Sequence, residues 1–241
     1  ADNDKEDGDI FCSELAIWDK CLTASEVSEL GSCTLNPAYL STRIPYLQSP
    51  GQSSVTISWH DKASEETKVE YGKDSLILNT TTTGDSEIIS VPYRWHTVKL
   101  TDLDPECRYY YRVSSGGISS KVYSFNTLPQ ITSTSKIRYL ILGDTHSSDT
   151  TMAGKVIRAA KAKMIEKFGW NFSDSVQGII HTGDIVVSGS SPEQYTNQFF
   201  KVLSSLTPYI PTMVVAGNHE AENAYFYSYL KLDELSAFPP S

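Results

Sequence analysis

The sequence has little positive charge and no long apolar run. Its 241 residues contain 20 Lys and Arg against 29 Asp and Glu, which gives a formal net charge of −9 at pH 7. Nucleic-acid backbones are bound through clusters of Lys and Arg, so this balance and the lack of a basic run argue against a nucleic-acid partner. No stretch of about 18 consecutive apolar residues occurs, so the sequence predicts no membrane span.

The N-terminus lacks both an initiating Met and an apolar leader. Its first ten residues, ADNDKEDGDI, are too polar for a signal peptide. We therefore expect a processed protein or an excised piece rather than a complete gene product.

Cysteine is scarce, and its spacing fits neither a CxxC zinc pattern nor a catalytic Cys motif. The four residues are Cys12, Cys21, Cys33 and Cys107. This pattern favours a secreted protein with one or two disulfides, and free thiols in a reducing cell are the alternative. The triplets Asn79-Thr80-Thr81 and Asn171-Phe172-Ser173 would allow N-glycosylation outside the cytoplasm. We expect a secreted or extracytoplasmic glycoprotein.

Short alternating runs separated by turn signals fill residues 36–128 and indicate an antiparallel β sandwich. Tyr109, Tyr111 and Val113 would share one face of a strand, and Tyr109 sits where a tyrosine corner would form. The region resembles a fibronectin type III domain with Trp59 as its core aromatic residue. Its run RWHTVKLTDLDPECRYYYRV is similar to the domain that precedes the catalytic domain of purple acid phosphatases.

A polar linker is predicted at residues 129–135, followed by a second domain over residues 136–241. Strands at 137–142, 178–182 and 213–215 alternate with helical patterns, which favours a parallel sheet. The first helix is predicted to end at Gly169. The second opens with Ser191 and Pro192, and Gln194 completes a predicted capping box.

Each predicted strand of this second domain ends in potential metal ligands. They are Asp144 and His146, then Asp184, then Asn218 and His219. Ligands gather beyond the carboxyl ends of strands in open α/β sheets, so these tips should converge. An Asp, His and Asn set suits iron, manganese or zinc. Two metals about 3.5–4 Å apart need a bridging carboxylate, and Asp184 is the natural bridge.

The three tips resemble the motifs GD-x-H, GD and GNH[DE] of the calcineurin-like metallophosphoesterase superfamily. The resemblance implies an αββα sandwich, in which Asp144 and His146 bind one metal, Asp184 bridges and Asn218 binds the second. His219 would then face the substrate, stabilising the phosphorus centre or protonating the leaving group. Glu220 either orients His219 or forms a surface salt bridge. The remaining histidines, His60, His96 and His181, are expected to be structural.

The sequence departs from the family pattern in three ways. Val187 replaces the tyrosine of purple acid phosphatases, so the iron charge-transfer colour is not expected, and His146 stands where that subfamily has glycine. No histidine follows His219, although the superfamily supplies further histidine ligands later in the domain. We therefore expect the first half of a catalytic domain, inactive alone, with an open sheet edge or exposed aromatic residues after residue 220.

The function predicted from this resemblance is a metal-dependent phosphoric ester hydrolase, an acid phosphatase-like phosphomonoesterase that uses a two-metal-activated water. The alternatives are a phosphodiesterase of the same superfamily or a non-catalytic extracellular binding or adhesion module. Residues 1–35, with the pattern ELAIWDK-LTASEV, resemble the tail of a concanavalin A or laminin-G-like lectin domain; an N-terminal extension is the other interpretation. A lectin tail would imply a carbohydrate or cell-surface partner.

Overall fold

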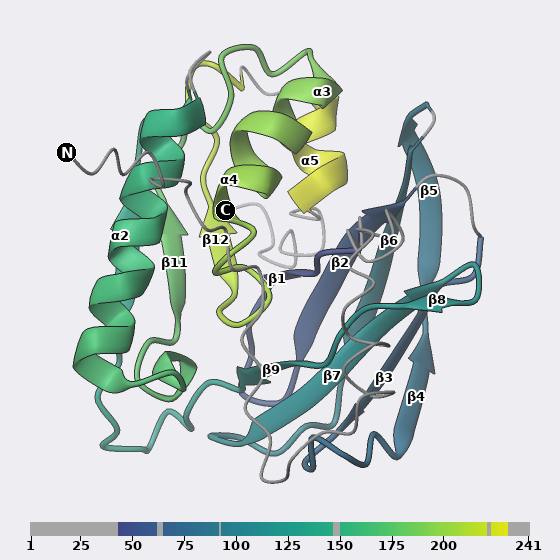
Figure 1. Ribbon diagram of the computed structural model, residues 1–241, viewed down its shortest axis with the longest axis vertical. Coiled ribbons are helices and arrows are strands. Elements are labelled where there is room, and N and C mark those ends of the chain that lie inside the picture. Colours follow the sequence, from purple (N-terminus) through teal and green to yellow (C-terminus); the bar gives the residue numbers. More distant parts are fainter. Residues whose placement is uncertain (1–42, 62–64, 92, 147–149, 221–222, 231–241) are drawn as a thin grey trace, which may run out of the picture. The chain divides into compact units, whose positions relative to one another are not determined.

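The computed structural model describes residues 43–61, 65–91, 93–146, 150–220 and 223–230 (Figure 1). The proposed lectin-like tail lies outside these residues, as do three of the four cysteines. The fourth, Cys107, is half-buried and has a free thiol. Within the described ranges, no helix has the length and apolar character needed to cross a bilayer.

The first part of the described chain is an antiparallel sandwich of the fibronectin type III kind. One sheet has the order β1-β2-β6-β5, built from β1 (Tyr46–Gln48), β2 (Val55–Asp61), β6 (Tyr93–Leu100) and β5 (Asp85–Ser90). The other has the order β4-β3-β7-β8, with β9 also paired to β7. Its strands are β4 (Thr80–Thr83), β3 (Lys68–Gly72), β7 (Arg108–Ser115), β8 (Ile118–Ser119) and β9 (Tyr123–Asn126).

Strand alternation places the sandwich core where the sequence predicts it. Tyr109, Tyr111 and Val113 of β7 are all buried, and Trp59 of β2 is fully buried. The backbone N–H of Asp104 donates to the Tyr109 hydroxyl at 2.9 Å, which confirms the tyrosine corner. The predicted buried face of β7 and the predicted tyrosine corner are therefore both present.

The second part contains one three-stranded parallel sheet of order β10-β11-β12. Its strands are β10 (Tyr139–Leu142), β11 (Gly178–His181) and β12 (Thr212–Val214). Its helices are α2 (Thr150–Phe168), the 3₁₀ helix η1 (Phe172–Asp174) and α5 (Ala224–Leu230), besides the segment described below. Gly169 ends α2 as predicted. It has φ 79°, and its N–H donates a hydrogen bond to the Ile165 carbonyl at 2.8 Å. The second sheet of an αββα sandwich stays a prediction.

The predicted second helix is interrupted by a π-helical turn. It consists of α3 (Pro192–Gln194), the π-helix η2 (Tyr195–Phe200) and α4 (Lys201–Leu203). The predicted capping box is wrong, because the Ser191 side chain makes no capping bond. The Gln194 side chain instead accepts the Ser188 N–H at 2.8 Å. The polar residue that suggested a cap therefore serves the preceding loop.

The expectation of exposed aromatics after residue 220 is wrong for the most apolar part of α5. Phe226, Tyr229 and Leu230 are buried. The Tyr229 ring packs against Trp95 and Phe200 at centroid distances of 5.1 and 5.4 Å. These contacts supply the apolar partners that were expected to be missing.

The tyrosine corner generates a stability prediction. Tyr109→Phe removes the acceptor for the Asp104 N–H while keeping the buried ring, so the free energy of unfolding should fall by about 1 kcal/mol. Urea unfolding followed by tryptophan fluorescence measures this change. The control is Tyr227→Phe, which makes the same chemical change at a residue that is 39% exposed. Equal stability of the two variants would show that the corner contributes nothing.

Candidate metal centre

Three turns follow the three parallel strands and are joined by backbone hydrogen bonds. The strand ends are level, because Leu142 pairs with His181 and His181 pairs with Val214. The N–H of Asp144 donates to the Gly183 carbonyl at 3.3 Å, and the N–H of His146 donates to the Asp184 carbonyl at 3.0 Å. The turn after β10 is thereby fixed against the turn after β11.

The third turn approaches the second very closely. The His219 N–H donates to Oδ1 of Asp184 at 3.0 Å. A Cβ on Gly217 would lie 2.3 Å from that same Oδ1, and a Cβ on Gly183 would lie 2.7 Å from the Gly217 nitrogen. Glycine is therefore required at both positions for the turns to meet.

Two of the proposed ligands have left-handed backbone conformations. Asp144 has φ 50° and Asp184 has φ 56°, a region that aspartate enters more readily than most residues but still at a cost. Such conformations persist only where the surroundings fix them, and they are frequent at functional sites. Here the surroundings are the hydrogen bonds between the turns.

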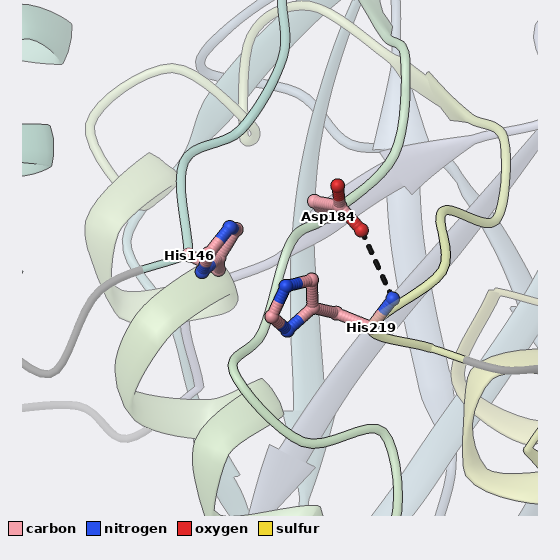
Figure 2. Close-up of side chains that lie close together, drawn as sticks. All are labelled: His146, Asp184 and His219. Atoms are coloured by element: carbon pink, nitrogen blue, oxygen red, sulfur yellow. Dashed lines mark hydrogen bonds between the residues drawn. The ribbon is translucent and has the colours of Figure 1, made fainter.

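The turns bring together the side chains of His146, Asp184 and His219. Their potential ligand atoms all lie within 4.8 Å of one another, and all three residues are half-buried (Figure 2). The two imidazole rings stack with centroids 4.1 Å apart and an angle of 26° between their planes. One residue from each strand end thus contributes to a single cluster.

The His219 ring is fixed through one of its nitrogens. Nδ1 lies 2.8 Å from the carbonyl oxygen of Val187. A carbonyl only accepts, so Nδ1 carries the proton and donates it in this bond. Nε2 is then the nitrogen that remains for a metal or for proton transfer.

The predicted ligands are only partly assembled. His146 and Asp184 lie together, and His219, predicted to face the substrate, lies with them among the potential ligands. Asp144 and Asn218 are both exposed on their turns, and Asp144 is not part of the three-residue cluster. Neither is covered by apolar side chains. The binding of Asp144 to the first metal and of Asn218 to the second stays a prediction.

His181 is a structural residue, as expected from the sequence, and both of its ring nitrogens have hydrogen-bond partners. It is fully buried, its Nδ1 accepts the Gly183 N–H at 3.3 Å, and its Nε2–H donates to the Thr145 hydroxyl at 2.8 Å. Burial lowers the pKa of this imidazole from 6.5 to about 4, against the opposing effect of nearby carboxylates. His181 therefore links the first two turns as a neutral ring.

Three residues near the site were missed or misassigned. Glu220 is fully buried, so its surface salt-bridge interpretation is wrong. Gln194 and Gln198, one helical turn apart, both accept backbone N–H groups of the loop after Asp184. The available signal was a polar Gln198 beside Phe199 on an otherwise apolar stripe, because a buried amide needs partners.

The donor set of the cluster fits a transition metal. Two imidazoles and one carboxylate are ligands that iron, manganese and zinc accept. A backbone carbonyl fixes His219 through Nδ1, which leaves Nε2 to face a bound ion or its substrate. The residues present therefore suit the metal ions expected from the sequence.

Comparison with known families identifies both parts of the chain. The family "Purple acid Phosphatase, N-terminal domain" matches residues 43–127, and "Calcineurin-like phosphoesterase" matches residues 137–240. The chain thus contains a purple acid phosphatase N-terminal domain followed by a calcineurin-like phosphoesterase segment.

Individual relatives agree with this assignment at low identity. The chain is 25% identical to zebrafish (Danio rerio) acid phosphatase type 7 over 184 residues, which covers 73% of this chain and 39% of that protein. It is 26% identical to purple acid phosphatase 21 of Arabidopsis thaliana over 167 residues, which covers 68% of this chain and 34% of that protein. The chain thus spans well under half of these relatives.

A solved structure shows the same fold. The purple acid phosphatase PPD1 isolated from yellow lupin (Lupinus luteus) seeds superimposes with a TM-score of 0.56 at 18% identity. The match covers 73% of this chain and 35% of that one. At this identity the likeness supports the arrangement of the strands and helices.

The buried His181 generates a pH prediction. Its imidazole should titrate near pH 4 in the folded protein, against 6.5 ordinarily, and NMR of the ring measures the midpoint. The unfolded chain takes up the proton more readily, so the free energy of unfolding should fall as the pH drops from 6.5 towards 4. His181→Gln should weaken this dependence. A folded-state midpoint near 6.5 would contradict the burial argument.

Proposed function

We propose that this protein is a metal-dependent phosphoric ester hydrolase that acts on phosphomonoesters, as an acid phosphatase does. The observation that carries the proposal is the approach of His146, Asp184 and His219 to within 4.8 Å on three turns of a calcineurin-like phosphoesterase segment. Phosphate esters are the substrates that the family implies. The preference for monoesters rests on the acid phosphatases among the relatives.

Two metal ions, of iron, manganese or zinc, would be held by residues of the three turns. Asp144 and His146 would hold one, Asn218 the other through its side-chain oxygen, and Asp184 would bridge them. When bound, the two ions supply an activated water as nucleophile and offset the charge that develops on the phosphoryl oxygens. The bond from the His219 N–H to one oxygen of Asp184 supports this arrangement, because it holds the Asp184 carboxylate beside the third turn.

His219 would serve the leaving group. The Val187 carbonyl accepts the Nδ1–H, so the imidazolium form of His219 would carry its second proton on Nε2, where it can be aimed at the substrate. As the phosphorus–oxygen bond breaks, Nε2–H would pass its proton to the departing alkoxide oxygen, which leaves as an alcohol with neutral His219 behind. Glu220 is not needed as a proton carrier in this scheme.

A secreted location is part of the proposal. The glycosylation triplets begin at Asn79 and Asn171, and both asparagines are exposed. The curated relatives include purple acid phosphatases from a plant. Exposed acceptors agree with passage through a compartment where glycans are added.

The direct experiment measures bound metal and ester turnover on the full-length protein, because residues 1–241 alone are expected to be inactive. We expect stoichiometric iron, manganese or zinc and faster hydrolysis of an aryl phosphate monoester than of the corresponding diester. A preference for the diester would favour the phosphodiesterase alternative. Bound metal without turnover of either ester would overturn the enzymatic proposal in favour of a binding module.

Two substitutions separate metal binding from proton transfer. Asp184→Ala should lose metal, since it removes the proposed bridge. His219→Ala should keep most of its metal and lower kcat by roughly a hundredfold or more, as expected for the loss of a general acid. Metal analysis and kinetics on the full-length protein distinguish them. If both variants lose metal equally, His219 is a ligand and its assigned role is wrong.

A further inference from the structure

The loop that starts at Asp184 is held by acceptors that lie outside the loop. Six successive backbone N–H groups, those of residues 184–189, each have a hydrogen-bond acceptor. The first three donate to the Glu220 carboxylate, the fourth to Gln198, the fifth to Gln194 and the sixth to the carbonyl of His219. The loop thus has a defined shape without help from strand pairing.

Glu220 is the centre of this arrangement. Its Oε2 accepts the N–H groups of Asp184 at 2.9 Å and Gly217 at 2.7 Å. Its Oε1 accepts those of Ile185 at 2.9 Å and Val186 at 3.2 Å. One fully buried carboxylate therefore joins the second turn to the third. Hydrogen bonds to a charged acceptor are among the stronger ones in proteins, and burial strengthens them.

The loop positions both reactive residues of the second and third turns. Asp184 opens it, and the Val187 carbonyl within it receives the His219 Nδ1–H at 2.8 Å. The N–H of that same Val187 donates to Gln198 at 2.9 Å. A Cβ on Gly189 would come within 2.4 Å of the Glu220 carbonyl, so the end of the loop also packs tightly on the third turn.

We infer that Glu220 is a positioning residue that shapes the Asp184 loop before any metal binds, with Gln198 setting the orientation of His219. This inference depends on the proposed function in one respect only: it takes metal binding to be the purpose of the loop's shape. The carboxylate accepts backbone donors from both turns, so its effect reaches the cluster through the backbone of Asp184 and Gly217.

The hydrogen-bond pattern makes glutamine an informative substitute. Each carboxylate oxygen accepts two N–H groups. In Glu220→Gln one of the two oxygens becomes an NH₂ group. Whichever way the amide is turned, this NH₂ group faces two backbone N–H donors. A change of a single atom therefore breaks two bonds and removes the charge, while the volume of the side chain stays nearly constant.

The test compares Glu220→Gln with Glu193→Gln in the full chain. Glu193 is exposed on α3, and its carboxylate accepts from Asn197 within the helical segment, so it undergoes the same chemical change without touching the Glu220 bonds. Titration with Mn²⁺ or Zn²⁺ should show a loss of affinity of about 10- to 100-fold for Glu220→Gln and none for the control. In metal-free protein, the amides of residues 184–186 and 217 should exchange hydrogen faster, while those of the β sandwich keep their protection.

Gln198→Met provides a second variant if Glu220→Gln does not fold. It leaves the Glu220 bonds in place and removes only the acceptor of the Val187 N–H. NMR should then show that the His219 imidazole, with its proton on Nδ1 in the parent protein, populates both tautomers. An unchanged tautomer in this variant would overturn the role of Gln198.

The outcomes separate this inference from the proposed function. If the parent protein binds metal without turnover, the enzymatic proposal fails and the affinity comparison still decides the role of Glu220. If the parent binds no metal, amide exchange and the His219 tautomer decide it. Affinity within twofold of the parent, together with unchanged exchange in Glu220→Gln, would overturn the inference.

Discussion

The level ends of three parallel strands are the constraint on which the candidate site depends. Leu142, His181 and Val214 lie side by side in the register, so the three turns that follow begin at the same height. The backbone bonds between the turns then leave little freedom in their separation. A slip of the strand register would separate His146 from Asp184 before any question of chemistry arises.

Buried polar side chains supply the second level of order. His181 links the first turn to the second as a neutral imidazole, and Glu220 links the second to the third as an acceptor of four backbone N–H groups. Left without partners, such groups would be costly in the interior. Their bonds therefore stabilise the same turn geometry that the cluster requires. The stability of this part of the fold and the geometry of the site thus depend on the same hydrogen bonds.

Much of this could be predicted from the sequence, and the failures have physical causes. Period-two alternation around Tyr109 and apolar runs ending in Gly-Asp or Gly-Asn gave the sandwich, the parallel sheet and the turns. The role of Gln194 could not be inferred from local pattern, because a capping glutamine and a loop acceptor look alike until the loop is placed. Burial of Tyr229 depends on Trp95, a contact across more than a hundred residues of sequence. The position of His219 beside His146 depends likewise on tertiary approach.

The central claim is that the three turns bind metal through Asp184 and its neighbours. Anomalous X-ray diffraction from crystals of the full chain grown with Mn²⁺ or Zn²⁺ tests it most directly. The account predicts metal peaks at about 2.0–2.2 Å from the Asp184 carboxylate and a His146 imidazole nitrogen. Metal bound elsewhere, with Asp184 and His146 free of it, would contradict the account.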